Sequence, residues 1–236
     1  MGEALRETAL DTLGVQGDRR WMVVDTQTGA LHTQRLLAQM TQLQARWLGS
    51  THLQLSAPGM SDMQVAVPDE QAPLRTVTIW RMTACRCRMP VMQLRAWLSQ
   101  WLGRACRLVQ VSEPRARQVD TAYAEVGDKA AFADGFPLLL IGQASLDDLS
   151  ARVGRPLPML RFRPNLVVSG SAAYAEDSWK RIRIGELEFR VVKGCSRCIM
   201  TTSTHKTGER SADRNEPLTT LKTYRERDGE VFSGRT

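Results

Sequence analysis

Apolar and polar residues alternate in short runs through the first third of the chain. Alternation with a period of two places every second side chain on one face of a strand, as Leu53 and Leu55 illustrate. The runs cover residues 21–25, 51–59, 63–67 and 75–80. A turn that ends at Gly29 predicts that the first strand returns as a hairpin through residues 30–35. Several short strands at this spacing are typical of an all-β barrel or sandwich.

The period of the pattern changes near residue 91. The apolar positions then recur at i, i+3, i+4, i+7 and i+8, which predicts one buried helix face that ends at Gly103. These positions are Leu94, Trp97, Leu98, Trp101 and Leu102. A strand is expected at 106–111. Residues 113–135 have little periodicity and predict a long loop, a kind of segment that often carries function in compact proteins.

The second half opens with an apolar run, residues 136–142, that has the length of a buried strand. Ser145 with Asp148 three residues later predicts the start of a short helix, and Gly154 predicts its end. A further strand is expected at 166–170.

A hairpin is expected at residues 181–192, with its turn at Gly185 and Glu186. Asn215 followed by Pro217 then predicts the start of a last helix. The chain is therefore expected to be mainly β with a few helices, an α+β fold.

The composition of the chain narrows the possible classes of protein. The chain has 236 residues, of which 42% are hydrophobic, so it can form a sizeable core. Its longest apolar run is far shorter than the roughly 18 residues of a membrane span, so no membrane partner is expected. Residues 1–11 carry no secretion signal. Five cysteines, an odd number, favour a reduced, cytoplasmic protein over a disulfide framework.

The formal charge is +7 at pH 7, but the arginines are dispersed along the chain. No block of five like charges and no nucleic-acid-binding module stands out, so no nucleic-acid partner is expected. Dispersed arginines also suit a small polyanion.

The segment "VVKGCSRCIMTT", residues 191–202, contains the candidate chemistry. Cys195 and Cys198 could supply half of a zinc site, and the other ligands would have to come from Cys85, Cys87 and His205. They could also be a redox pair or two buried thiols.

A fourth hypothesis is a single activated thiolate. Lys193 and Arg197 flank the cysteines, and a nearby cation lowers the pKa of a thiol. A soft thiolate suits a thiophilic metal.

A series of motifs, in order and in spacing, resembles the MOSC family from about Glu3 to Phe232. The motifs are "GVQGDRRWMVVDTQTGALHTQR", "FADGFPLLLIGQASLDDL", "RFRPNLVVSG", "YAEDSWKRIRIGELEF", "VVKGCSRCIMTT" and "EPLTTLKTYR". The resemblance implies a MOSC N-terminal β-barrel-like domain at 1–107 and a MOSC β-barrel domain at 108–236. Within the family, the pattern is similar to the bacterial relatives of the mitochondrial amidoxime reducing component.

This resemblance implies a molybdenum cofactor and the two-electron reduction of N-hydroxylated small molecules. The electrons would come from a separate reductase or a ferredoxin-type protein. A non-catalytic MOSC protein that carries the cofactor or sulfur is the alternative.

The resemblance also implies roles for particular residues. Cys198 would be the molybdenum ligand and the catalytic residue, with Cys195 in support. The other implied cofactor-binding residues are Arg19, Asp134, Gly135, Arg163, Asn165 and Ser196. Arginine suits a phosphate because its planar fork can donate two parallel hydrogen bonds.

Both ends are expected to be truncated relative to the family. The opening strand with its "PVKS"-type turn would precede Met1, and the closing strands would follow Thr236.

Overall fold

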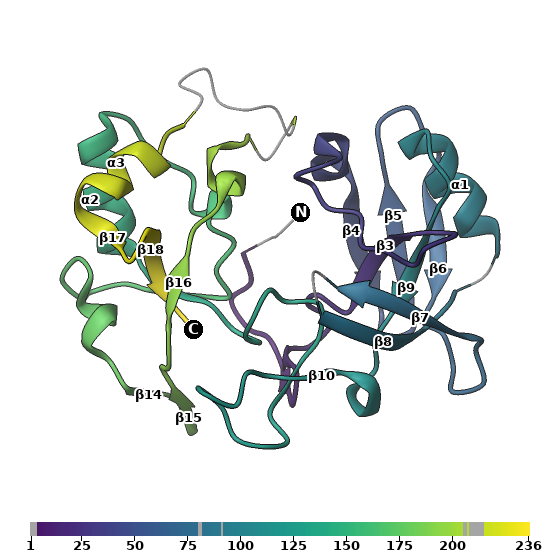
Figure 1. The fold of residues 1–236 in the computed structure, drawn as a ribbon, viewed down its shortest axis with the longest axis horizontal. Helices are drawn as coiled ribbons and strands as arrows, with labels where there is room; N and C mark the ends of the chain where they lie inside the picture. The colour runs from purple at the N-terminus through teal and green to yellow at the C-terminus, as the bar shows by residue number, and fades with distance from the viewer. Residues whose placement is uncertain (1–3, 80–81, 91, 205–206, 208–214) are drawn as a thin grey trace.

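The computed structural model describes residues 4–79, 82–90, 92–204, 207 and 215–236. In this part of the chain, strands predominate and three α-helices occur, so the prediction of a mainly β protein with a few helices is confirmed. The N-terminal half lies on the right of Figure 1 and the C-terminal half on the left.

Two antiparallel sheets and one helix make up most of the N-terminal half. The four-stranded sheet has the order β3 (Trp21–Asp25), β9 (Cys106–Gln110), β8 (Met82–Arg88), β7 (Leu74–Ile79). The three-stranded sheet is β4 (Gln44–Leu48), β5 (His52–Ser56), β6 (Met63–Ala66), and the helix is α1 (Met92–Leu102). The sequence therefore predicted the types of β3, β5, β6, β7, β9 and α1 correctly, whereas β4 and β8 were not predicted.

The apolar face of α1 closes the core of this half. Leu94 and Leu98 are almost fully buried, and they pack in one cluster with Leu53 and Leu55 of β5. The indole N–H of Trp97 donates to the carbonyl of Ser61 at 2.8 Å, which satisfies its polar atom in this apolar setting.

The expected β-barrel is not closed in the N-terminal half. Among the described residues, β4–β5–β6 is a sheet separate from β3–β9–β8–β7, and neither closes on itself. Residues 30–35 do turn back after β3, but they form isolated bridges instead of a strand: Leu31 pairs with Val24, and Ala30 pairs with Thr78 of β7. The period-two pattern specifies which face of a strand is buried, and it does not specify which edge strands pair.

A second sheet system organises the C-terminal half. Its order is β13 (Leu166–Val168), β12 (Leu140–Gly142), β18 (Glu230–Arg235), β16 (Gly194–Ser196), with β17 (Glu226–Arg227) paired to β18. The helices are α2 (Gln143–Val153) and α3 (Leu218–Arg225), and the predicted hairpin is β14 (Arg181–Ile184) and β15 (Leu187–Arg190). Leu149 of α2 and Leu221 of α3 pack with Ile141 in the core of this half.

Strand β18 lies in the middle of this sheet, although the hydrophobic pattern does not predict it. Its buried positions are Ser233 and Gly234 rather than large apolar residues. A Cβ on Gly234 would lie 2.7 Å from a side-chain carbon of Ile141, and φ is 76° there. This strand is therefore buried because its backbone lies close to that of β12, and no pattern of apolar residues in the sequence reveals such packing.

The start of α2 also differs from the prediction. The helix begins at Gln143, so Ser145 lies inside it instead of capping it. The Ser145 hydroxyl donates to Oε2 of the buried Glu176 at 2.9 Å, and the amide of Gly142 donates to Oε1 at 3.1 Å. A distant carboxylate thus takes over the capping role. The helix ends at Gly154 as predicted, with φ at 78°.

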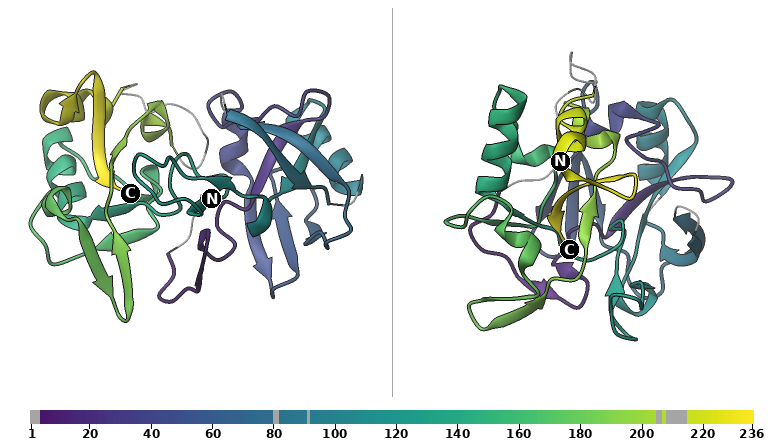
Figure 2. Two further views of the ribbon diagram at one scale, coloured as in Figure 1. Left: turned by 60° about the horizontal axis from the view of Figure 1, so that its bottom comes forward. Right: turned by 60° about the vertical axis from the view of Figure 1, so that its left-hand side comes forward.

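The segment that joins the two halves is largely irregular, as expected for 113–135, and Figure 2 shows it running between them. Within it β10 (Arg117–Gln118) pairs with β11 (Lys129–Ala130), and Ala131 packs into an N-terminal core cluster. The division of the chain into two domains between residues 107 and 108 remains a prediction.

The remaining short elements are β1 (Leu10–Asp11), β2 (Gly14–Val15), η1 (Ala38–Gln42), η2 (Glu113–Arg115), η3 (Met159–Arg161), η4 (Ala175–Ser178) and η5 (Ile199–Thr202).

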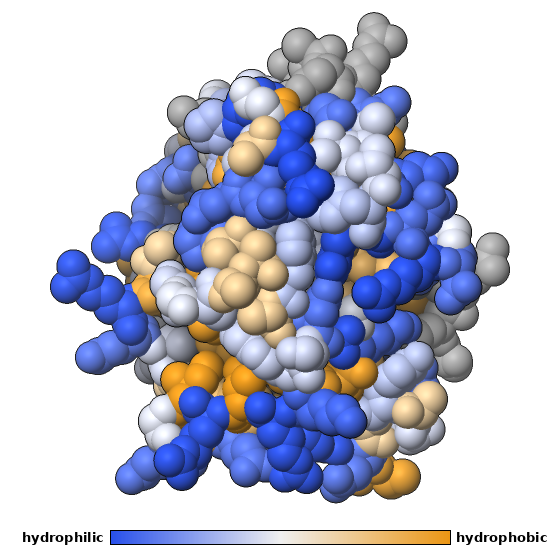
Figure 3. Space-filling view, turned by 90° about the vertical axis from the view of Figure 1, so that its left-hand side faces the viewer, coloured by the Kyte–Doolittle hydropathy of each residue, from blue (hydrophilic) through white to orange (hydrophobic). Residues whose placement is uncertain are grey.

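The face of the C-terminal half in Figure 3 is mostly hydrophilic, with a band of apolar groups toward its lower edge. Exposed apolar side chains of this half include Ile184 and Leu187 at the turn of the β14–β15 hairpin. In the part of the chain that the structure describes, none of the helices combines the length and the hydrophobicity needed to cross a lipid bilayer.

Candidate functional site

Arg19 joins the N-terminal half to the "FRPN" motif of the C-terminal half. Its guanidinium donates to Oδ1 of Asn165 at 3.1 Å and to the carbonyl of Arg163 at 3.0 Å. These partners lie about 145 residues away in sequence. Arg19 and Arg163 both have positive φ, 51° and 52°, a conformation that side-chain-bearing residues rarely adopt. Such outliers persist where the surrounding structure enforces them, and they often mark functional sites.

Asn165 is the hub of this junction. Its amide oxygen accepts bonds from Arg19 and from the backbone N–H of Leu139, at 3.1 Å each. Its amide nitrogen donates to Oδ2 of Asp18 at 2.8 Å. One amide N–H is left for a ligand, so the first contribution of Asn165 is to orient Arg19.

Arg163 retains most of its donor capacity. Its one hydrogen bond within the described residues is a long one, 3.5 Å, to Oε1 of Gln34. Desolvation, and then the nearby charge of Arg19, lower the pKa of the Arg163 guanidinium, while Asp18 and Asp134 act in the opposite direction. The side chain is nevertheless accessible to solvent. The two adjacent guanidiniums of Arg19 and Arg163 favour an anion. The region bounded by Arg19, Arg163 and Cys198 is called the recess.

Cys195 and Cys198 lie at the end of β16 and take different environments. Cys195 packs against the C-terminal core, and burial raises the pKa of its thiol while Arg197 opposes that rise. Cys198 immediately precedes η5, and its sulfur is 3.2 Å from Nη2 of Arg35. Of the two sulfurs, that of Cys198 therefore faces the N-terminal half.

Arg197, between the two cysteines, is committed to structure. Its Nε donates to the carbonyl of Ser233 at 2.7 Å and its Nη1 donates to the carbonyl of Phe162 at 3.1 Å. Desolvation lowers the pKa of this guanidinium, and the two neighbouring thiols counteract that effect. The side chain fixes the cysteine loop to β18 and supplies a buried positive charge beside both sulfurs.

Three predicted site residues make weaker connections. The carboxylate of Asp134 acts electrostatically on Arg163, Arg197 and Cys195, so it belongs to the same region, and its carbonyl accepts from Arg117 at 2.9 Å. A Cβ at Gly135 would meet no atom within 4 Å, so the space beside that glycine is open. Ser196 is exposed on β16, opposite Phe232 of β18. Their roles as ligands stay predictions.

Two contributing residues, Gln34 and Arg35, were not predicted. They occupy one turn of the N-terminal half and contact Arg163 and Cys198, respectively. The turn lies in the segment "LHTQR", to which no role is assigned from the sequence. A polar pair on an exposed turn has no periodicity, and only its contacts across the two halves reveal it.

The described residues do not support a zinc site that joins the two cysteine pairs. Cys85 and Cys87 are buried on β8 in the N-terminal core, with their sulfurs 3.4 Å apart. Nowhere in the described ranges do three His, Cys, Asp or Glu side chains gather as a metal would require. His205, the other possible ligand, lies outside those ranges.

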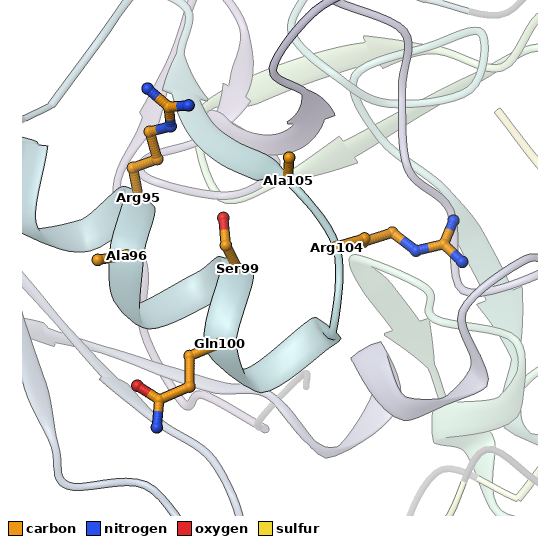
Figure 4. Close-up of a pocket in the computed structure, with 6 residues that line it drawn as sticks. All are labelled: Arg95, Ala96, Ser99, Gln100, Arg104 and Ala105. Atoms are coloured by element: carbon orange, nitrogen blue, oxygen red, sulfur yellow. The ribbon is translucent and has the colours of Figure 1, made fainter.

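A shallow cavity of about 580 Å³ lies on α1, away from the cysteine loop. Figure 4 shows its two arginines, Arg95 and Arg104, pointing in different directions, away from the Ser99 hydroxyl between them. A binding site needs polar groups that converge, so this hollow is not the candidate site.

Comparison with known proteins finds two family matches. Residues 127–236 match the MOSC domain, and residues 1–105 match the MOSC N-terminal beta barrel domain. Mitochondrial amidoxime-reducing component 1 of Homo sapiens is 34% identical over 222 residues, which cover 89% of this chain and 63% of that protein. Mitochondrial amidoxime reducing component 2 of Rattus norvegicus is 33% identical over 98% of this chain and 70% of that protein.

A molybdenum cofactor sulfurase of Oryza sativa is 36% identical over 60% of this chain, which is 19% of its own length. The chain thus spans less than two thirds of several relatives, including the human protein and the Mus musculus component 1, of which it matches 38%. A solution structure of a Bordetella bronchiseptica protein overlaps 46% of this chain and 89% of that one, at a TM-score of 0.38 and 18% identity, which is too slight to define the fold.

Proposed function

Because the chain belongs to the MOSC family and carries both its N-terminal and its MOSC regions, we propose that it binds the molybdenum cofactor and reduces N-hydroxylated small molecules. Relatives at 33–34% identity are named amidoxime-reducing components, and another is named a molybdenum cofactor sulfurase. These names support both the cofactor and the class of substrate.

One observation carries the proposal. Gln34 and Arg35 are adjacent in the chain, and they contact Arg163 and Cys198, respectively. Arg19 contacts the backbone of Arg163 from the same half. Two cations and one partly buried thiol thus meet in one recess, although they come from segments far apart in sequence.

The chemistry of these groups fits the cofactor. A phosphate on the pterin would suit the spare donors of Arg163 beside Arg19, because charge-assisted bonds from a guanidinium to phosphate are strong and directional. The sulfur of Cys198 is a soft donor of the kind that binds thiophilic metals. In this proposal Cys198 is the protein ligand, Cys195 packs behind it, and Asp134, Gly135 and Ser196 line the recess.

When bound, the molybdenum cofactor would supply a centre that exchanges two electrons. The overall reaction breaks the N–O bond of the substrate and releases water, so it consumes two electrons and two protons. The electrons would come from a separate reductase or ferredoxin-type protein. The chain's own residues bind the anionic part of the cofactor through Arg19 and Arg163 and hold the ligand sulfur on a fixed loop through Arg197.

The sulfurase relative favours a second candidate, a MOSC protein that carries the cofactor or its sulfur without turnover. The two candidates share the same recess and differ only in whether substrate is reduced.

Metal analysis combined with an activity assay tests the proposal. The protein is expressed in a host that makes the molybdenum cofactor, and molybdenum, zinc and pterin are measured per chain. Reduction of an amidoxime is then assayed with a chemical electron donor. Molybdenum with turnover supports the reductase, and molybdenum without turnover supports the carrier. Stoichiometric zinc without molybdenum rules out both.

A further inference from the structure

We propose that Arg35 is a positioning residue for the Cys198 sulfur, so that the site is complete only when the N-terminal half contributes to it. Its Nη2 donates to that sulfur at 3.2 Å, across 163 residues of sequence. The part of the inference that concerns the metal rests on the proposed function. The contact itself does not.

The turn that carries Arg35 is held in place on both sides. Before it, the amide of His32 donates to the carbonyl of Val23 in β3 at 2.9 Å. After it, the amides of Leu36 and Leu37 donate to the carbonyl of Thr33, at 3.0 and 2.9 Å. The following η1 is fixed to the end of α1, because Gln39 donates to the carbonyl of Trp101 at 2.6 Å. Hydrogen bonds to the N-terminal core therefore hold the backbone of the turn that carries Arg35.

The sulfur is equally well placed on its own side. The amide of Arg197 donates to the carbonyl of Val231 at 2.7 Å, which ties the loop to β18. The amide and the hydroxyl of Thr201 both donate to the carbonyl of Cys198, at 3.1 Å each. Two anchored backbone segments thus place a guanidinium and a sulfur within hydrogen-bond distance of each other.

A hydrogen bond to a ligand sulfur changes what that sulfur does. An N–H donor withdraws electron density from a thiolate, and hydrogen bonds to sulfur ligands are among the factors that set metal reduction potentials. The donor stabilises the more negative, reduced state of the centre. Arg35 would therefore raise the reduction potential of a metal bound by Cys198, and the N-terminal half would thereby tune a ligand that belongs to the C-terminal half.

The test compares Arg35→Gln and Arg35→Lys with a matched control, Arg46→Gln, which changes an exposed arginine on β4 of the same half. In metal-free protein, the alkylation rate of Cys198 is measured by peptide mass spectrometry with anionic iodoacetate and with neutral iodoacetamide. Both reagents attack the same thiolate, so the ratio of the rates reports the local positive charge and cancels the thiolate fraction.

A severalfold fall of the iodoacetate-to-iodoacetamide ratio in Arg35→Gln supports the proposal, provided that Arg35→Lys retains most of the ratio and Arg46→Gln all of it. An unchanged ratio in Arg35→Gln overturns the proposal, whether or not the protein binds metal. If the ratio falls but the wild-type protein takes up no molybdenum, the contact stands and the proposed function fails.

In loaded protein, the Mo(V) electron paramagnetic resonance signal and the midpoint potential provide a second readout. Arg35→Gln should shift the signal and lower the potential at equal molybdenum content, and Arg35→Lys should recover part of both. A signal and a potential identical to those of the wild type would overturn the tuning role.

Discussion

The two cysteine pairs of this chain show how spacing and surroundings decide the chemistry of a thiol. Cys85 and Cys87 are two residues apart on one strand, so both side chains lie on the same face, which is buried. Cys195 and Cys198 are three residues apart across the end of a strand, so one thiol packs against the core and the other enters a recess. The first pair is enclosed by protein, and the second is partly accessible.

Their electrostatic settings differ as well. The Cys87 thiol donates to the Cys85 sulfur, which lowers the pKa of Cys85 and raises that of Cys87. At the second pair, Arg35 and Arg197 supply positive charge from outside. The comparison indicates that accessibility and nearby cations distinguish the two pairs more than the cysteine spacing does.

The largest effect is expected at Cys198. Cys198→Ala should reduce molybdenum per chain to background, because no other sulfur in the recess can take its place. Cys195→Ala should retain most of the metal, because that thiol packs behind the loop. Metal analysis of both variants beside the wild type checks this, and an equal loss in the two variants would contradict a single-ligand site.

A smaller effect is expected from the anion-binding side of the recess. Arg163→Ala should weaken cofactor binding by about one to two decades, since one charged hydrogen bond to phosphate is worth about 1.5–3 kcal/mol. Pterin content after dialysis measures the change. Arg183→Ala, an exposed arginine on β14, is the control and should have no effect. Full retention of pterin in Arg163→Ala would exclude Arg163 from the cofactor site.

A substitution in the buried pair, Cys85 and Cys87, should lower the stability of the protein and leave its metal content unchanged. Cys87→Ala leaves a small cavity at a fully buried position, so we expect the free energy of unfolding to fall by about 1–2 kcal/mol. Chemical unfolding under reducing conditions measures the loss. Molybdenum per chain should equal that of the wild type, and a drop in metal without a drop in stability would assign the first pair a role that its burial does not suggest.

The smallest effect concerns pH. Burial raises the pKa of Cys106, a buried thiol on β9 that belongs to neither pair, whereas the unfolded thiol ionises near its ordinary 9.0. The stabilisation that depends on the protonated thiol is thus complete below pH 9 and is lost as the pH rises toward the folded pKa. The loss arises because the unfolded state releases its thiol proton at a lower pH than the folded state does.

The difference in unfolding free energy between the wild type and Cys106→Ala should therefore shrink between pH 8 and pH 10. Urea unfolding at both pH values checks this trend. A difference that does not change with pH would mean that Cys106 ionises equally well in both states.

The sequence by itself determined the local structure where a pattern has a single physical meaning. Period two placed Leu53 and Leu55 in a core, and period 3.6 placed Leu94 and Leu98 there, because burial of apolar area is the dominant favourable term in folding. The order of its motifs also identified the MOSC family, which the family matches confirm. Cys198, Arg163 and Arg19 were named as candidates on that resemblance alone.

Only the tertiary structure determined which segments of the chain contact each other. Strand β18 is buried through Ser233 and Gly234, and Glu176 replaces Ser145 at the start of α2; neither arrangement has a local signature. The contact between Arg35 and Cys198 depends on the docking of two halves across 163 residues. Hydrophobic periodicity reports which face of an element is buried, whereas a site between two halves is held by polar contacts whose partners can lie anywhere in the chain.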